Sequence, residues 1–164
     1  MNAVFDNKQF RQVLGNFPTG VVIISGIDQS GLPQGVTIGS FTSVSLDPPL
    51  VGFFPGSTSV TWPAIAASGS FCVNVLAEDQ GELCWRFAKE TEGRYEGVPW
   101  TPAPSGSPKL AGALAYIDCT LESSSPVGDH LFVVGRAQHL EKVSGSDKAM
   151  VFFRGVVAGV SPLT

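Results

Sequence analysis

Apolar residues near the start of the chain recur at the spacing of an amphipathic helix. They stand at positions i, i+3, i+4 and i+7: Phe10, Val13, Leu14 and Phe17. Asp6 is a suitable N-cap with Gln9 three residues later, and Phe5 can pack against Phe10 just before the helix. We therefore predict a helix over residues 6–17.

Most of the remaining pattern is that of β-strands. Runs of β-branched and alternating residues predict strands over Val21–Ser25, Val36–Ser45, Leu50–Phe54, residues 70–76, Ala113–Ser123, His130–Lys142 and Ala149–Val157. Two more segments have helical patterns, a short one over residues 60–68 and a longer one over Ala77–Ala88. Because the helices do not alternate with the strands, an antiparallel barrel or sandwich is favoured over a doubly wound parallel sheet.

Residues 97–108, GVPWTPAPSGSP, are rich in proline and glycine. Such a composition interrupts regular structure, so we expect a long exposed excursion at this point of the chain. The sequence leaves open whether this segment gates a site or packs against a partner subunit.

The composition fits one domain spanning residues 1–164, with 43% hydrophobic and only 15% charged residues. So few charges indicate that a partner subunit covers part of the apolar surface. The formal net charge is −4 and no basic run occurs, which argues against nucleic acid or an anionic membrane as a partner. The first residues lack the apolar segment of a signal peptide, and no apolar run approaches the length of a membrane span. We therefore expect a cytoplasmic protein.

Cysteine and histidine are too few and too scattered for a metal site. Cys72, Cys84 and Cys119 form no CxxC pair, and we read them as buried free thiols of a reducing compartment. The two histidines, His130 and His139, do not stand at zinc-ligand spacing from these cysteines. We expect no metal centre.

The common nucleotide and hydrolase motifs are missing from the sequence. There is no GxGxxG that opens a helix after a strand, no GxxxxGK[ST], no HExxH and no GxSxG. A Ser-His-Asp triad would need one of the two histidines. Asp129 is next to His130, and neighbours on a strand face opposite sides, so that pairing is disfavoured.

One stretch carries a regular series of hydroxyls, FTSVSLDPPL over residues 41–50. Ser43 and Ser45 alternate with apolar residues, so on a regular strand they face the same side. Small hydroxyls together with free backbone N–H groups suit a phosphate or a polyol chain. Asp47 and the two prolines after it end the strand and can leave backbone donors unpaired. The alternative is a solvated strand face that ends at an ordinary turn, and spacing alone leaves both readings open.

The order of several segments resembles the short-chain flavin reductases, the small reductase components of two-component flavin-dependent monooxygenases. The segments are FPTGVVIIS, GVTIGSFTSVSLDPPLVGF, STSVTWPAI, FCVNVLAEDQGELCWRFA and GDHLFVVGRAQHL. The resemblance implies a mainly β fold, a split β-barrel of Greek-key antiparallel type with a few flanking helices, usually as a homodimer with sites near the subunit interface. It also implies that NADH or NADPH passes a hydride to FMN or FAD, and that reduced flavin reaches a separate monooxygenase.

Carried over residue by residue, the resemblance places two groups of residues along the flavin. Thr37 and Ser40 would lie along the edge of the isoalloxazine ring or the ribityl chain. The residues that would run beside the ring and ribityl chain are Phe41, Thr42, Ser43, Val44 and Ser45.

The resemblance also implies residues for the phosphate and the nicotinamide. The hydroxyls that would hold the phosphate are Ser57, Ser59 and Thr61. Arg94 would add a cation near them, and Asn74 and Phe87 would line the cofactor pocket. His130, in the GDH segment, would be the catalytic residue beside the nicotinamide.

One departure from the expected pattern concerns the phosphate loop, FFPGSTS, which lacks Lys and Arg. The phosphate charge would then be met by neutral donors, by Arg94 or by the partner subunit, and the choices of FMN or FAD and of NADH or NADPH stay open. Two other functions also stay open. One is a flavin carrier or sensor without reductase activity, and the other is an oxidase related to the pyridoxamine-phosphate oxidases, which generally use basic residues for the phosphate.

Overall fold

The computed structural model describes residues 4–143, 145, 148–160 and 163. Its helices are α1 (Asn7–Leu14), α2 (Thr61–Ala66) and α3 (Gly81–Lys89). Its strands are β1 (Thr19–Gly20), β2 (Val22–Ile27), β3 (Pro33–Ile38), β4 (Thr42–Leu46), β5 (Pro49–Phe53), β6 (Ser70–Val75), β7 (Trp100–Pro102), β8 (Pro108–Leu110), β9 (Ala115–Val127), β10 (His130–Lys142), β11 (Met150–Phe153) and β12 (Val156–Gly159).

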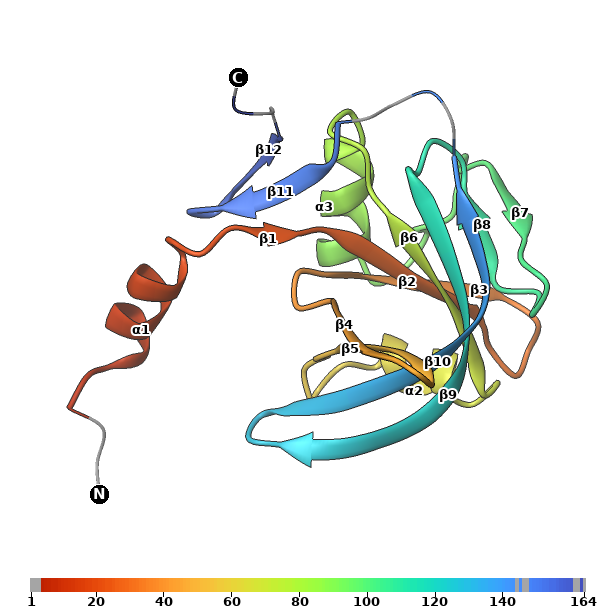
Figure 1. Ribbon diagram of the computed structural model, residues 1–164, viewed down its shortest axis with the longest axis horizontal. Helices are drawn as coiled ribbons and strands as arrows, with labels where there is room; N and C mark the ends of the chain where they lie inside the picture. Colours follow the sequence, from red (N-terminus) through yellow and green to blue (C-terminus); the bar gives the residue numbers. More distant parts are fainter. Residues whose placement is uncertain (1–3, 144, 146–147, 161–162, 164) are drawn as a thin grey trace.

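The main sheet is antiparallel, with strand order β3-β2-β6-β9-β10-β5-β4. The hairpin of β9 and β10, 13 residues in each strand, joins its two halves, because β9 pairs with β6 and β10 pairs with β5. Figure 1 shows that the sheet is strongly curved, with β2 and β3 on one side and the end of the β9–β10 hairpin on the other. Two small sheets, β1-β11-β12 and β7-β8, flank it. The predicted mainly β, antiparallel architecture is confirmed.

The predicted single strand Val36–Ser45 is wrong, because this segment forms parts of two strands. β3 pairs with β2 at one end of the sheet order, β4 pairs with β5 at the other end, and residues 39–41 connect them. A chain that changes its pairing partner must leave the ladder, and Gly39 stands at the point where it does so. This corner brings the end of β3 close to the end of β5.

Ser43 and Ser45 do not share a face, contrary to the expectation from their spacing. The register of β4 against β5 shifts between them, so that Ser43 pairs with Val51 and Ser45 pairs with Leu50. Val51 and Leu50 are neighbours on a strand and face opposite sides, so their partners do as well. The irregularity inserts one extra residue, which simple alternation cannot reveal.

One apolar core is built around three aromatic rings. Phe53, Trp62 and Phe71 meet edge to face, with ring centroids 5.1, 5.4 and 5.8 Å apart. Gly135 of β10 lies directly against Phe71, and a Cβ at this position would overlap the ring. A second cluster around Phe87 of α3 covers the other face of β2, which explains the continuous apolar run of that strand.

Residues 97–108 contain regular structure, contrary to the sequence expectation. β7 and β8 pair as a short hairpin, and Pro108 is buried. The Pro108 carbonyl accepts a hydrogen bond from Ser25 Oγ at 2.6 Å, and Leu110 N donates to Asn74 Oδ1 at 2.7 Å. These long-range bonds fix the segment against β2 and β6, which local composition cannot predict.

α1 begins as predicted but ends earlier. Asp6 Oδ1 accepts a hydrogen bond from Gln9 N at 2.7 Å, and the Phe5 and Phe10 rings stack with centroids 5.8 Å apart. The regular helix ends at Leu14, and the next residues form tighter turns, since Asn16 N bonds to Val13 O and Phe17 N to Leu14 O. None of its residues is buried, and Figure 1 shows the helix standing away from the sheet. Its apolar stripe therefore lacks a partner within the described part of the chain.

The other two helices are shorter than the patterns indicated. α2 lies within the predicted segment 60–68. α3 begins at Gly81 rather than at Ala77, because Ala77 pairs with Ala149 in an isolated β-bridge that keeps the preceding backbone extended. No helix in the described residues is long and apolar enough to cross a bilayer.

The three cysteines are buried and unpaired, as predicted. Burial raises the pKa of Cys72 and Cys119 to about 12. Neither thiol is therefore a nucleophile near neutral pH.

Candidate functional site

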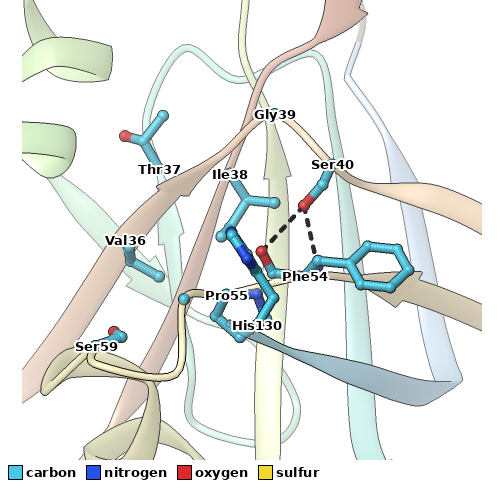
Figure 2. A pocket seen from close by; sticks show the side chains of 10 residues that line it. Val36, Thr37, Ile38, Gly39, Ser40, Phe54, Pro55, Ser59 and His130 are labelled. Atoms are coloured by element: carbon cyan, nitrogen blue, oxygen red, sulfur yellow. Dashed lines mark hydrogen bonds between the residues drawn. The ribbon is translucent and has the colours of Figure 1, made fainter. Parts of the chain in front are cut away.

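An open cavity of about 490 Å³ lies beside the end of β3 and the start of β10. Figure 2 shows the three segments that surround it: residues 36–40, the loop over residues 54–59, and His130. Half of its lining side chains are apolar, and the hydroxyls of Thr37, Ser40 and Ser59 and the His130 ring are placed among them. A cavity of this size with a few polar groups suits an organic ligand that has a flat apolar part and a polar part.

Ser40 fixes the corner between β3 and β4 to the end of β5. Its Oγ accepts a hydrogen bond from Phe54 N at 3.0 Å and donates to Phe54 O at 3.3 Å, as Figure 2 shows. The Phe54 ring stacks on Phe132 of β10, with centroids 4.8 Å apart. Thr37 is similarly engaged, since its hydroxyl donates to the Cys84 carbonyl at 2.7 Å. These two hydroxyls therefore shape the cavity wall.

Backbone hydrogen bonds hold the start of β10 against the loop over residues 54–59. Leu131 N donates to Pro55 O at 2.9 Å, and Ser57 N donates to Asp129 O at 2.9 Å. Gly56 and His130 pair in an isolated antiparallel bridge. The position of the His130 side chain at the cavity is thus set by main-chain pairing.

His130 and Asp129 interact directly, which corrects the expectation that sequence neighbours could not pair. His130 Nδ1 lies 2.7 Å from Asp129 Oδ1, because Asp129 belongs to the turn before β10 and not to the strand. The hydrogen bond with His130 lowers the pKa of Asp129. In the tautomer that donates Nδ1–H to this carboxylate, Nε2 is left to accept a hydrogen bond. No serine hydrogen-bonds to the ring among the described residues, so this pair does not form a hydrolase triad.

The loop over residues 54–59 is backed by a half-buried arginine. Arg94 Nη1 donates to Thr61 Oγ1 at 2.8 Å and to Gly35 O at 2.6 Å, and Nε contacts the Glu90 carbonyl. Burial lowers the pKa of Arg94. Ser59 Oγ accepts a hydrogen bond from Trp62 N at 3.2 Å at the start of α2. Arg94 therefore lies behind the hydroxyl-rich loop. It contacts the loop through Thr61, which is two residues after Ser59 of the cavity wall.

A second and larger cavity, of about 1320 Å³, adjoins the first. One wall is α1 and the segment after it, and another wall is the β11–β12 turn. Gly39, Ser40 and His130 line both cavities. The two spaces therefore meet at His130.

The structure brings together some of the predicted site residues but not all. Those that line the first cavity are Thr37, Ser40, Ser59 and His130. Those outside both cavities are Phe41, Thr42, Ser43, Val44, Ser45, Ser57, Thr61, Asn74, Phe87 and Arg94. Phe41 packs on the core, and most of β4 is exposed at the sheet edge. Contacts of these residues with a flavin stay a prediction.

Asn74 and Phe87 have structural surroundings. Asn74 is fully buried, and its amide donates to Ile23 O at 3.1 Å and to Ser25 Oγ at 2.9 Å. Its Oδ1 accepts the hydrogen bond from Leu110 N described above. Phe87 is fully buried between the second apolar cluster and the Tyr95 ring. Neither side chain lines one of the two cavities. Their contacts are those of structural residues, whereas the resemblance implied contact with the ligand.

Sequence reasoning missed two groups of lining residues. In the first cavity these are Phe54, Pro55 and Gly56, which carry no motif of their own and become wall residues only through pairing with β10. In the second cavity they include Lys8, Arg11 and Arg154. In the sequence, Lys8 and Arg11 stand on the polar side of the predicted N-terminal helix. This position is equally consistent with an ordinary solvent-exposed helix face, so it does not identify them as site residues.

The described residues contain no group of three or more His, Cys, Asp or Glu that could hold a metal. The first cavity combines an apolar wall, hydroxyls and one histidine, and it opens onto a second cavity large enough for another ligand. This arrangement can place two organic molecules next to each other at His130.

Several known proteins with similar sequences are flavin reductases or reductase subunits of monooxygenases. The family described as "Flavin reductase like domain" matches residues 14–161. A flavin reductase of Pseudomonas putida is 42% identical over 163 residues, covering 99% of this chain and 95% of that protein. The reductase subunit HsaB of a flavin-dependent monooxygenase from Rhodococcus jostii is 47% identical over 157 residues, covering 96% of this chain and 80% of that protein.

Solved structures agree with these sequence relatives. Nitrilotriacetate monooxygenase component B from Mycobacterium thermoresistibile is similar with a TM-score of 0.92 and 42% identity, covering 96% of this chain and 88% of that chain. The NADH:FAD oxidoreductase SgcE6 from Streptomyces globisporus gives a TM-score of 0.88 and 32% identity, covering 99% and 98%. These matches confirm the split-barrel fold that was predicted.

We predict that Asn74→Ala lowers the free energy of unfolding by about 2–4 kcal/mol in the absence of any ligand, because buried backbone groups lose their partners. Urea denaturation of protein freed of small molecules measures this. Gln29→Ala, an exposed amide in the β2–β3 turn, is the control and should change stability little. Unchanged stability together with a loss of flavin affinity would instead assign Asn74 to the ligand.

Proposed function

This chain belongs to the flavin reductase-like family, and on that premise we propose that it transfers hydride from NADH or NADPH to FMN or FAD and supplies reduced flavin to a separate monooxygenase. The observation that carries the proposal is the pair of adjoining cavities that share the His130 wall. A reductase of this kind must hold a flavin and a nicotinamide nucleotide in contact. Two cavities that meet at the His130 side chain would allow the two ligands to lie in contact.

We assign the first cavity to the isoalloxazine ring. A bound flavin supplies the redox chemistry, since its ring accepts the hydride, and the chain's residues bind and orient. The apolar wall, which includes Ile38 and Phe54, excludes water from the ring. Thr37 and Ser40 hold the wall in shape, and residues 41–45 would contact the ring edge and the ribityl chain with their backbone groups. These contacts are expectations carried over from the family resemblance.

For the flavin phosphate we propose the hydroxyls of Ser57, Ser59 and Thr61, with Arg94 behind them. The support is the hydrogen bond from Arg94 to Thr61, which polarises that hydroxyl, and the position of Ser59 at the cavity. The loop itself carries no cation. Such a site binds phosphate with neutral donors and one indirect charge, which fits a flavin that dissociates after reduction.

We propose that His130 contacts the nicotinamide. Asp129 fixes its protonated Nδ1, so Nε2 is free to accept a hydrogen bond from the carboxamide. Hydride transfer itself needs no acid or base, so the contribution of this residue is to align the two rings. His130 would thus act by positioning the dinucleotide.

Relatives give the context of the partners. The relative from Rhodococcus jostii is a reductase subunit of a flavin-dependent monooxygenase, and SgcE6 is an NADH:FAD oxidoreductase. Another structural neighbour, the flavin reductase HpaC, was solved in complex with NADP⁺. By analogy we propose a nicotinamide nucleotide and a monooxygenase as partners of this chain. The three buried, unpaired thiols are compatible with a cytoplasmic location.

We further propose that the chain, a single domain over residues 1–164, forms a homodimer through α1. The apolar stripe of this helix is exposed: Phe10 50%, Val13 62%, Leu14 52% and Phe17 73%. A contiguous apolar stripe of this kind on a projecting helix is characteristic of a subunit interface. A second copy would cover it.

The test of the proposed activity mixes purified protein with NADH or NADPH and with FMN, FAD or riboflavin. We expect flavin-dependent loss of the nicotinamide absorbance at catalytic amounts of protein, in the presence of at least one flavin. Binding of flavin without oxidation of either nucleotide would instead indicate a carrier or sensor.

We predict that His130→Ala lowers kcat/KM for the nicotinamide nucleotide about tenfold or more, because ring alignment is lost, while flavin affinity changes little. Stopped-flow reduction at saturating flavin measures this. His139→Ala, the other histidine and exposed on β10, is the matched control. Equal hydride-transfer rates and equal nucleotide affinity in wild type and His130→Ala would remove His130 from the mechanism.

We predict that Val13→Glu shifts the protein from dimer to monomer, because a charge would be buried in the interface. Light scattering after gel filtration gives the mass. Leu32→Glu, at an equally exposed apolar position (59%) in the β2–β3 turn, should remain dimeric. A dimer that is insensitive to Val13→Glu would place the interface elsewhere.

A further inference from the structure

Some of the Lys and Arg side chains of this chain form ion pairs with acidic side chains, and others do not. Four of the ten form ion pairs with acidic side chains: Arg86 with Glu82, Lys109 with Glu141, Arg136 with Glu122 and Lys148 with Glu78. Lys8 and Arg11 of α1 have no hydrogen bond or ion pair from their side chains within the described residues. Arg11 is only attracted at a distance by Asp129. The charge of these two side chains is therefore available to an anion.

These two cations and a third line the same cavity. Lys8, Arg11 and Arg154 all belong to the wall of the 1320 Å³ space between α1 and the β11–β12 turn. On α1, Lys8 and Arg11 stand three residues apart, so both side chains can face this space. Among the residues that the structure describes, no acidic side chain lines it. In a chain of net charge −4, this cavity is a local concentration of positive charge.

Arg154 is held in place at some conformational cost. It is the non-glycine residue with a positive φ, 50°, among the described residues, and it stands in the β11–β12 turn before Gly155. Its Nε and Nη2 donate to Asn16 Oδ1 at 2.9 and 2.7 Å, and its N donates to Gly15 O at 3.0 Å. An amide partner leaves the guanidinium charge uncompensated. The contact fixes α1 relative to the turn and keeps a positive charge at the junction.

We propose that this α1 cavity binds the diphosphate of an adenine dinucleotide, with Lys8 and Arg11 as the binding residues and Arg154 as a positioning residue. The inference rests on the proposed reductase function. It adds to that function a binding site for the diphosphate in the middle of the dinucleotide. The hydroxyl-rich loop of the first cavity contains no cation that could bind this group.

The location and lining of the cavity fit this ligand. It begins at Gly39, Ser40 and His130, where the reactive ring of the dinucleotide would lie. Its remaining wall contains the aromatic ring of Phe152, on which an adenine can stack and which lies outside the apolar stripe assigned to the second copy. A diphosphate carries two negative charges, and cations on flexible stems can contact it without a glycine-rich loop.

Both NAD(P)H and FAD contain this diphosphate, and FMN lacks it. The experiment therefore uses Lys8→Gln, Arg11→Gln and the double variant, which keep length and helix propensity but remove charge. NADH affinity is measured by fluorescence titration, and FMN and FAD affinities by quenching of flavin fluorescence, each over a range of salt concentration. Lys142→Gln, an exposed lysine at the opposite end of β10 from His130, is the matched control.

For the double variant we expect about a tenfold weaker affinity for at least one adenine dinucleotide, and a flatter dependence of that affinity on salt. FMN affinity should change less than about twofold, because its phosphate lies at the other loop. Loss of NADH affinity identifies the nicotinamide nucleotide as the occupant, and loss of FAD affinity with NADH unchanged identifies the flavin dinucleotide. Lys142→Gln should behave as wild type in each titration.

Unchanged affinities for NADH, NADPH and FAD in the double variant would overturn the proposal. So would a change in molecular mass without a change in nucleotide affinity, because the cations would then serve the subunit interface. Failure of the reductase function is a separate result. In that case the wild type fails to oxidise NAD(P)H, yet the charge-dependent difference in dinucleotide binding would still be measurable.

Discussion

The candidate site depends on the main-chain pairing between the start of β10 and the loop that follows β5. Three contacts make this junction: Leu131 N with Pro55 O, Ser57 N with Asp129 O, and the bridge between Gly56 and His130. They set the position of His130 at the edge of the first cavity, and the stacking of Phe54 on Phe132 closes the wall beside it. Ser40 then attaches the β3–β4 corner to the same junction. Because every one of these contacts is between strands distant in sequence, the site exists only when the sheet has curved.

The distribution of charge separates two tasks. The loop over residues 54–59 offers hydroxyls and carries no charged side chain, and Arg94 behind it is engaged by Thr61 and the Gly35 carbonyl. Two cations without an ion pair among the described residues, Lys8 and Arg11, stand instead on α1, which projects from the main sheet and is held to the β11–β12 turn by the bond between Arg154 and Asn16. A ligand phosphate in the first cavity meets mainly neutral donors, which favours exchange, while a diphosphate over α1 would meet full charges.

The interior explains why several polar residues are present without a chemical role. Asn74 connects β2, β6 and β8 with hydrogen bonds to Ile23, Ser25 and Leu110. It satisfies the backbone of the proline-rich segment, which would otherwise bury unpaired groups. Its position in a motif shared with flavin reductases is therefore compatible with a structural contribution to the fold.

The sequence by itself determined the mainly β class, the N-cap of α1, the buried thiols and the resemblance that led to the family. These features depend on residues close together in the chain, where spacing and side-chain chemistry are enough. It also named Thr37, Ser40, Ser59 and His130, which line one cavity in the structure. It could not reveal the division of Val36–Ser45 into two strands, the register shift between Ser43 and Ser45, or the contact between His130 and Asp129. Only the tertiary structure decided these, and with them the cavity over α1, because each depends on which distant strand or turn a residue meets, and a periodic pattern carries no information about partners.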